Sequence, residues 1–133
     1  MLADPYGTND ITHDIIGGAI QIHRTIGPGL LESAYAACLA LELSERGHAI
    51  ERKKPVPLVY KSVRLDVAYY LDILVDGRVI VELKCVDALA PVHEAQMLTY
   101  LRLTECPVGL LINFNVPVLK DGLQRVVNSM AKS

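Results

Sequence analysis

The stretch YLDILVDGRVIVELK, residues 70–84, consists of two short apolar segments on either side of Asp76-Gly77. An Asp-Gly pair between apolar runs is a strong hairpin signal. We therefore predict antiparallel strands over residues 63–75 and 78–85. The hairpin that they form decides how the rest of the chain can be arranged.

An acidic residue interrupts each of these strands. Asp72 lies in the first strand, and Glu82 lies in the second, two residues before Lys84. Successive side chains of a strand point to opposite faces, so Glu82 and Lys84 share a face. Two carboxylates side by side would form a hard oxygen site suited to Mg²⁺ or Mn²⁺, with Lys84 neutralising charge on a phosphate. An ion pair between the carboxylates and Lys84 at the end of the sheet is the alternative.

The length of the hairpin loop decides whether the two carboxylates meet. A two-residue turn would pair Val75 with Arg78, and Asp72 would then point away from Glu82. A three-residue loop, 76–78, or a bulge would set Asp72 opposite Glu82. The metal-site hypothesis requires the second arrangement.

Hydrophobic periodicity predicts the remaining elements. Helices are expected over 10–24, 30–46 and 90–105, further strands over 49–60 and 107–114, and either a strand or a short helix in 116–133. Gly17-Gly18 inside the first helix either weakens the prediction of a helix there or marks a close contact with another element. This order indicates the α/β class, with a sheet flanked by helices.

Composition narrows the class of protein. A chain of 133 residues fits one domain, 1–133, and 51% hydrophobic with 21% charged residues argues against disorder. The net charge of -2 excludes a uniformly basic nucleic-acid coat protein.

A nucleic-acid partner would need a bound cation or a local basic cluster. The candidates for phosphate contacts are Arg52, Lys53, Lys54, Lys61 and Arg64. Solubility of an edge strand is the alternative role for this cluster.

The expected compartment is the cytoplasm. The cysteines, Cys38, Cys85 and Cys106, are odd in number and far apart, which indicates free thiols in a reducing environment. No apolar run is long enough to span a membrane, and the first residues do not have the pattern of a signal peptide.

Two helices add polar residues that could join the strand carboxylates. Gln96 and Tyr100 follow His93 at helical spacing on the helix after the Glu82 strand, where they could orient the lysine, a water or a phosphate oxygen. A helix face wetted by solvent is the alternative. Glu32 lies on the inward side of the second helix and needs a partner there.

The motif Gly29-x-x-Glu32-x-x-Tyr35 resembles the signature of the GxxExxY proteins, a bacterial branch of the PD-(D/E)XK nuclease superfamily. The resemblance continues through YLDILVDGRVIVELK, LAPVHEAQMLTYL and GLLINFN in the family's order, over roughly residues 11–127. It implies a restriction-endonuclease-like α-β-β-β-α-β core with a mixed sheet flanked by helices.

The resemblance also implies roles for individual residues. Asp72, Glu82 and Lys84 look like the D…E-x-K triad, Gln96 and Tyr100 look like the Q-x-x-x-Y element of the RecB-like nucleases, and Glu32 looks like the acidic residue from an early helix. The implied activity is metal-dependent hydrolysis of phosphodiester bonds, in DNA. Mg²⁺ or Mn²⁺ would be bound by Glu32, Asp72, Glu82 and the Leu83 carbonyl.

Three scattered cysteines cannot build the four-cysteine iron–sulfur cluster of some RecB-like relatives. A non-catalytic nucleic-acid-binding or protein-binding module with the same fold is the alternative function. A protein partner and a homo-oligomer both stay open.

Overall fold

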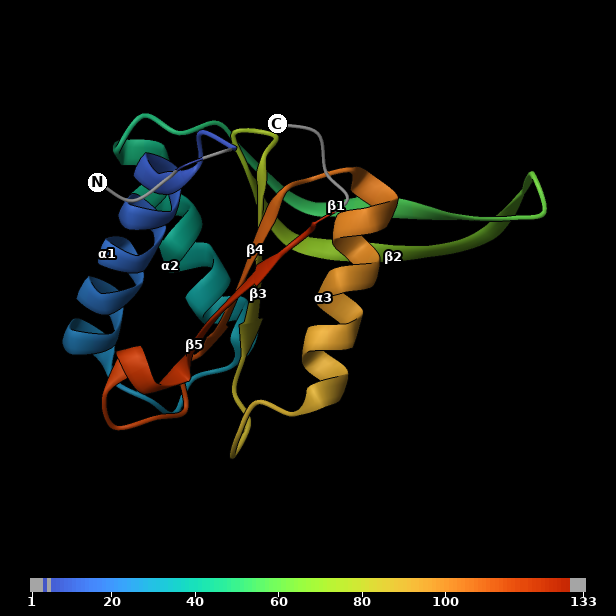
Figure 1. Cartoon of the computed structure of the whole chain (residues 1–133). Helices are drawn as coiled ribbons and strands as arrows, with labels where there is room; N and C mark the ends of the chain where they lie inside the picture. Colours follow the sequence, from blue (N-terminus) through green and yellow to red (C-terminus); the bar gives the residue numbers. More distant parts are fainter. Residues whose placement is uncertain (1–3, 5, 130–133) are drawn as a thin grey trace.

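A computed structural model describes residues 4 and 6–129 (Figure 1). The helices are α1 (Asn9–Ile26), α2 (Glu32–Glu45), α3 (Pro91–Thr104) and the short 3-10 helix η1 (Leu119–Gly122); the strands are β1 (Ile50–Tyr60), β2 (Val63–Val75), β3 (Val79–Lys84), β4 (Val108–Asn113) and β5 (Leu123–Val127). Every helix and strand predicted before residue 116 is confirmed, with ends that differ by a few residues. Residues 1–3, 5 and 130–133 of the predicted domain lie outside the described residues.

The strands form one mixed sheet in the order β1-β2-β3-β4-β5. β3 and β4 are parallel, and the other neighbouring strands are antiparallel. A parallel pair needs a long crossover, which α3 supplies. Figure 1 shows α1 and α2 on one side of the sheet and α3 on the other. The predicted α/β class and the mixed sheet flanked by helices are confirmed.

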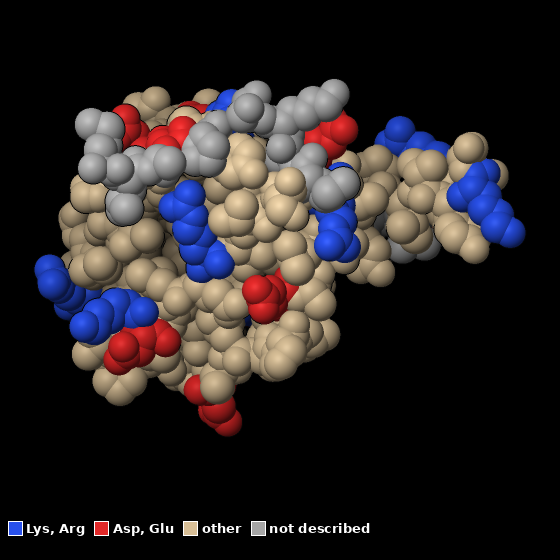
Figure 2. Space-filling view, in the orientation of Figure 1, with Lys and Arg blue, Asp and Glu red and all other residues tan. Residues whose placement is uncertain are grey.

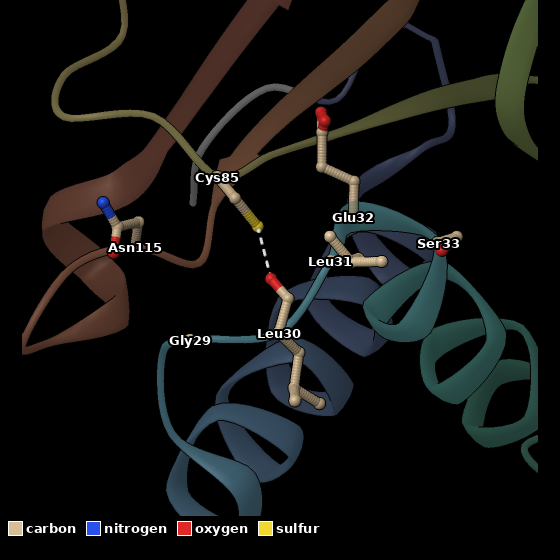
Figure 3. A pocket seen from close by; sticks show the side chains of 7 residues that line it. All are labelled: Gly29, Leu30, Leu31, Glu32, Ser33, Cys85 and Asn115. Carbon is tan, nitrogen blue, oxygen red and sulfur yellow. Dashed lines mark hydrogen bonds between the residues drawn. The ribbon is translucent and has the colours of Figure 1, made fainter.

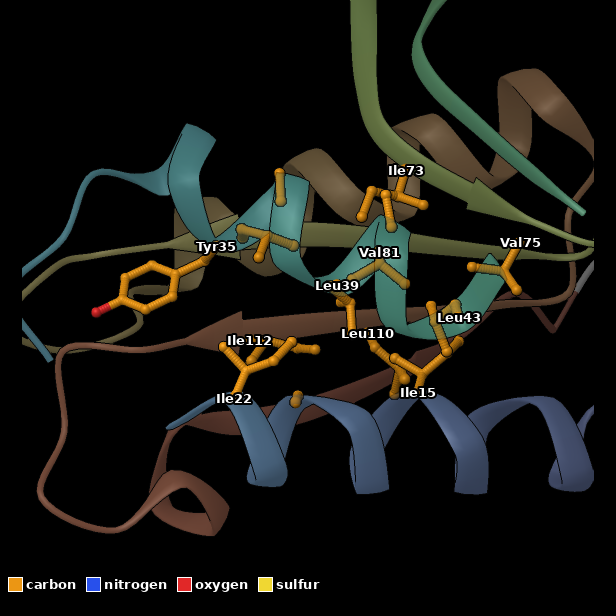
Figure 4. Close-up of a cluster of buried hydrophobic side chains, with 14 of the residues drawn as sticks. Ile15, Ile22, Tyr35, Leu39, Leu43, Ile73, Val75, Val81, Leu110 and Ile112 are labelled. Carbon is orange, nitrogen blue, oxygen red and sulfur yellow. The ribbon is translucent and has the colours of Figure 1, made fainter. Parts of the chain in front are cut away.

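Two apolar layers hold the helices on the sheet. One layer joins α1 and α2 to the sheet through residues such as Ile15, Leu39 and Val81 (Figure 4). The other layer joins α3 to the opposite face through Met97, Leu101 and their neighbours. β3 and β4 are buried on both faces, which explains why their sequences are mostly apolar, apart from Glu82, Lys84 and Asn113, rather than alternating.

The Gly17-Gly18 pair lies where α1 crosses α2, as predicted. A Cβ built on Gly18 would lie 3.0 Å from Cγ of Glu42 and 3.5 Å from Cδ1 of Leu39. The absence of a side chain therefore lets the two helices approach closely.

The chain after β4 resolves into η1 and β5. β5 pairs antiparallel with β4, from Val108 opposite Val127 to Ile112 opposite Leu123. The interpretation of this segment as a strand is therefore the correct one, with a short helix before it. Among the helices of the described residues, none is both long enough and apolar enough to cross a membrane.

The hairpin of β1 and β2 extends beyond the two layers and projects from the body of the molecule (Figure 1). At its tip Tyr60 pairs with Val63, so the turn consists of Lys61 and Ser62, which have φ angles of 51° and 64°. The pairing register shifts between Pro57 and Leu58. Such an irregularity increases the local twist of a hairpin.

Candidate active site

The loop between β2 and β3 has the length that the metal-site hypothesis requires. Val75 pairs with Val79, so the loop contains residues 76–78, and its first two residues have positive φ angles of 53° and 65°. The ladder continues to the pair of Ile73 with Val81. One further step sets Asp72 opposite Glu82 on adjacent strands.

Backbone amides hold the two carboxylates in place reciprocally. The Asp72 N–H donates to Oε1 of Glu82 at 3.2 Å, and the Leu83 N–H donates to Oδ2 of Asp72 at 2.8 Å. Each carboxylate therefore binds the backbone of the opposite strand. The prediction that these two side chains meet is supported by this geometry.

β2 changes direction at Asp72. Leu71 is buried in the layer under α3, whereas Ile73 is buried in the layer under α1 and α2, although residues two apart in a regular strand share a face. In a regular ladder Lys53 of β1 would pair with Asp72 of β2, but this pair is missing. Lys53 has a φ angle of 51°. β2 is therefore distorted at Asp72, between a residue that is buried in one layer and a residue that is buried in the other.

Glu82 is buried, and its electrostatic surroundings oppose ionisation. Burial, the charge of Asp72 and a hydrogen bond with the Asp72 carboxyl raise the pKa of Glu82 to about 8, while the Asp72 N–H and Lys84 act in the opposite direction. Within the described part of the chain no ion pair shorter than 4.0 Å links Lys84 to either carboxylate. The alternative interpretation, an ion pair of Lys84 with Asp72 or Glu82, is therefore not supported by the described residues.

α3 brings Tyr100 to the same carboxylates. Tyr100 is buried, and desolvation, Glu82, Tyr69 and Asp72 all raise its pKa. Gln96, one turn earlier on α3, is exposed, and its hydrogen bonding opposes the rise. Of these two residues, Tyr100 lies near the pair, whereas the exposed Gln96 interacts with Tyr100.

The loop before α2 explains the spacing of the Gly-x-x-Glu-x-x-Tyr motif. Gly29 has a φ angle of 114°, a conformation that favours glycine. The Tyr35 hydroxyl donates to the Gly27 carbonyl at 2.5 Å and accepts from the Leu30 N–H at 3.2 Å, which ties the loop to the helix. As a result α2 begins at Glu32.

Glu32 lies between two hollows in the surface. One has a volume of 120 Å³ and is lined by Glu32 together with Asp72, Arg52 and Lys53. The other has a volume of 640 Å³ and is lined by residues that include Cys85 and Asn115, which follow the carboxyl ends of β3 and β4 (Figure 3). Crevices at the carboxyl ends of parallel strands are the usual binding places in α/β folds.

A family model described as the PD-(D/E)XK nuclease superfamily matches residues 9–126. The chain belongs to this superfamily. No curated protein and no solved structure matches it. The match includes Asp72, Glu82 and Lys84, and with the strand order above it shows the predicted restriction-endonuclease-like fold. Membership also indicates a nuclease-type domain.

The donor atoms of this PD-(D/E)XK domain fit a divalent cation. Carboxylate oxygens are the ligands that Mg²⁺ and Mn²⁺ prefer, and a cation beside Glu82 would relieve the repulsion that raises its pKa. Among the described residues, however, no three His, Cys, Asp or Glu side chains are grouped closely enough to hold a metal ion. The structure brings Asp72 and Glu82 together, and it places Glu32 on the wall of a pocket that is lined by Asp72 but not by Glu82.

The predicted basic cluster divides into three parts. Arg52 and Lys53 line the pocket beside Asp72, and Lys54 forms an ion pair with Glu51 at 2.7 Å. The remaining two residues, Lys61 and Arg64, lie on the projecting hairpin. Only the first pair is therefore adjacent to the carboxylates.

Tyr69 lies near the PD-(D/E)XK site, although the sequence patterns did not indicate it. Its ring centroid lies 6.0 Å from that of Tyr100. The signal that could have identified it is its position on β2, three residues before Asp72. His23, in contrast, is bonded through Nε2 to the Val116 carbonyl at 2.7 Å, as expected of a core histidine.

Proposed function

We propose that this PD-(D/E)XK domain is a metal-dependent nuclease that hydrolyses phosphodiester bonds in DNA. We place it with the GxxExxY proteins and the RecB-like branch, and its free thiols suit the cytoplasm. The observation that carries the proposal is the pair formed by the half-buried Asp72 and the buried Glu82, held by reciprocal amide bonds beside Lys84. A purely structural role would not explain why a carboxyl group is buried against a second carboxyl group.

Asp72, Glu82 and the Leu83 carbonyl would hold Mg²⁺ or Mn²⁺, with Glu32 facing them from the wall of the pocket. When bound, the cation would supply Lewis-acid stabilisation of the phosphate and lower the pKa of a water. Glu82 would enter this state ionised, because a neighbouring cation favours the charged carboxylate.

The remaining residues would act on the water and the phosphate. Lys84 would orient the attacking water and offset negative charge on the phosphate. Gln96 and Tyr100 would position the lysine or the scissile phosphate from α3. Arg52 and Lys53 would bind phosphates next to the pocket, and Lys54, Lys61 and Arg64 would bind them farther along the hairpin.

A non-catalytic binding module is the second candidate. The observation that favours it is the projecting hairpin, whose exposed Tyr60 and Val63 could bind a partner without any reaction. Nucleic acid and protein are both open as partners for such a module, including a second copy of the chain.

Metal binding and cleavage separate the two candidates. Mn²⁺ at a hundredfold its dissociation constant should stabilise the fold by about 2.7 kcal/mol, and this gain should be lost in Asp72→Asn. Lys84→Ala should keep the stabilisation and lose cleavage of a labelled oligonucleotide. Lys120→Ala, which removes an exposed lysine of η1, is the matched control and should change neither. A melting temperature indifferent to millimolar Mn²⁺ would refute the enzyme and leave the binding module.

A further inference from the structure

Charge is distributed unevenly between the projecting hairpin and the rest of the chain. We call residues 50–70 the arm; it contains five Lys or Arg and two Asp or Glu, a net charge of +3. Because the whole chain has a net charge of -2, the remainder has a net charge of -5. In Figure 2 the described residues of the projecting part show Lys and Arg and no Asp or Glu on the visible face. The arm is therefore a local basic surface on an acidic protein, which favours a polyanionic partner.

The arm also carries exposed aromatic rings. Tyr60, Tyr69 and Tyr70 are 65%, 46% and 60% exposed, and within the described residues these are the exposed aromatic side chains. The single phenylalanine, Phe114, and Tyr35 are fully buried. Large rings that remain in solvent on one hairpin, among basic residues, need a binding partner to be explained.

The strand register sorts these rings by face. Val56 pairs with Tyr69, Leu58 with Leu65, and Tyr60 with Val63. Paired residues share a face, and residues two apart along β1 share it too, so these six side chains form one continuous face. Its inner end reaches the candidate active site, because Tyr69 lies 6.0 Å from Tyr100.

Tyr70 belongs to the other face of the arm. It pairs with Pro55, one residue away from the positions that form the aromatic face. Arg64 pairs with Val59 and shares that second face with it. Tyr70 is thus an exposed tyrosine on the same hairpin that cannot reach a ligand lying along Tyr60 and Tyr69.

We infer that the face of the arm bearing Tyr60 and Tyr69 binds a single-stranded nucleic acid, which it guides to the Asp72–Glu82 pair. Tyrosine rings stack on unpaired bases with little regard to sequence, whereas paired bases inside a duplex do not offer their faces. Tyr60 lies about 13 Å along β1 from the level of Tyr69, far enough for separate bases to occupy the two rings. The inference rests on the proposed function for the reaction, but binding itself does not require it.

Basic residues stand at both ends of the arm. Lys61 lies at the tip beside Tyr60, with its Nζ 5.6 Å from the ring centroid. Arg52 and Lys53 lie at the base of the arm, where they line the pocket with Asp72 on the α2 side of the sheet, opposite to the side of Tyr69 and Tyr100. Phosphates of a strand stacked on the tyrosines would meet positive charge at the tip, where the strand enters.

Binding is tested without divalent cations, so that no strand is cut during the measurement. Fluorescence anisotropy of a labelled single-stranded oligonucleotide in EDTA should show that Tyr60→Leu and Tyr69→Leu each weaken binding at least about fivefold, the loss expected for one stacked base. Tyr60→Phe and Tyr69→Phe keep the ring and should keep the affinity. Tyr70→Leu is the matched control and should bind like the wild type, and the corresponding duplex should bind more weakly than the single strand.

Equal losses in all three tyrosine-to-leucine variants, or in none, would overturn the inference, as would a preference for duplex. A dimer that Tyr60→Leu separates, with oligonucleotide binding unchanged, would assign the arm to a second copy instead. Tyrosine-dependent binding without cleavage in Mn²⁺ would refute the proposed function and keep the inference. If the protein cleaves single strands in Mn²⁺ and Tyr60→Leu and Tyr69→Leu cleave them as well as the wild type does, the proposed function is kept and the inference is refuted.

Discussion

Replacing Glu82 by glutamine should stabilise the metal-free protein at neutral pH. Glu82 is buried beside Asp72, and its pKa rises from 4.5 to about 8. The folded protein therefore keeps a proton on Glu82 that the unfolded chain releases above pH 4.5. Glutamine is neutral at every pH, can still accept from the Asp72 N–H, and can donate its own N–H to the Asp72 carboxylate.

The size of the effect follows from the shift in pKa. The stabilisation that comes from protonated Glu82 is fully present below pH 4.5, the pKa of this group in the unfolded chain. It is lost as the pH rises through the pKa of about 8 that the group has in the folded protein. Between these values the free energy of unfolding should fall by about 1.4 kcal/mol per pH unit. At pH 7 the loss amounts to about 3 kcal/mol, or roughly 10 °C in melting temperature for a chain of this length.

Urea denaturation in EDTA from pH 4 to pH 9 measures this difference. The wild type and Glu82→Gln should be equally stable near pH 4 and should diverge toward pH 8. Glu45→Gln, which removes an exposed carboxylate at the end of α2, is the control and should run parallel to the wild type above pH 5. Parallel curves for Glu82→Gln over the same range would refute the burial of a protonated Glu82, whatever the protein's activity.

Other parts of the fold give three further predictions. His48 contacts Asp76 at 2.5 Å and Asp14 at 2.7 Å, and these raise its pKa. The stabilisation of the fold by protonated His48 should be fully present below pH 6.5 and should be lost as the pH rises through the raised pKa of His48 in the folded protein. In urea titrations His48→Gln should abolish this pH dependence. Tyr35→Phe should lower the free energy of unfolding by about 0.5–1.5 kcal/mol, because the Gly27 carbonyl and the Leu30 N–H lose their hydrogen bonds to the Tyr35 hydroxyl. Gly122→Ala should lower the melting temperature, because its Cβ would collide with a backbone carbonyl.

Local patterns predicted the elements of the fold because each pattern has a local cause. The apolar runs of β3 and β4 are buried on both faces, and Gly18 permits the contact between α1 and α2. The segment after residue 116 was ambiguous, since LQRVV becomes a strand through pairing with β4, a contact across the sheet. Long-range pairing of this kind leaves little trace in local propensity.

The candidate site was predictable in residue type but not in geometry. The chemistry of Asp72, Glu82 and Lys84 is visible in the sequence, yet Asp76-Gly77 is compatible with a two-residue turn and with the three-residue loop that the structure has. The change of direction at Asp72 has no local signal either, because it depends on Lys53 in a different strand. The inner position of Tyr69 follows from the same register.

Three departures from local rules in this protein lie at or next to Asp72. A regular strand would keep Leu71 and Ile73 in one layer, a lysine would avoid the positive φ of Lys53, and a stable core would not bury Glu82 against another carboxyl group. Each departure costs free energy in the metal-free fold. Departures of this kind are expected where a site must be ready for a ligand before the ligand arrives. A cation bound between the carboxylates would turn the largest of these costs into binding energy. Glu82→Gln should therefore be more stable than the wild type without metal, and it should lose the stabilisation that Mn²⁺ gives to the wild type.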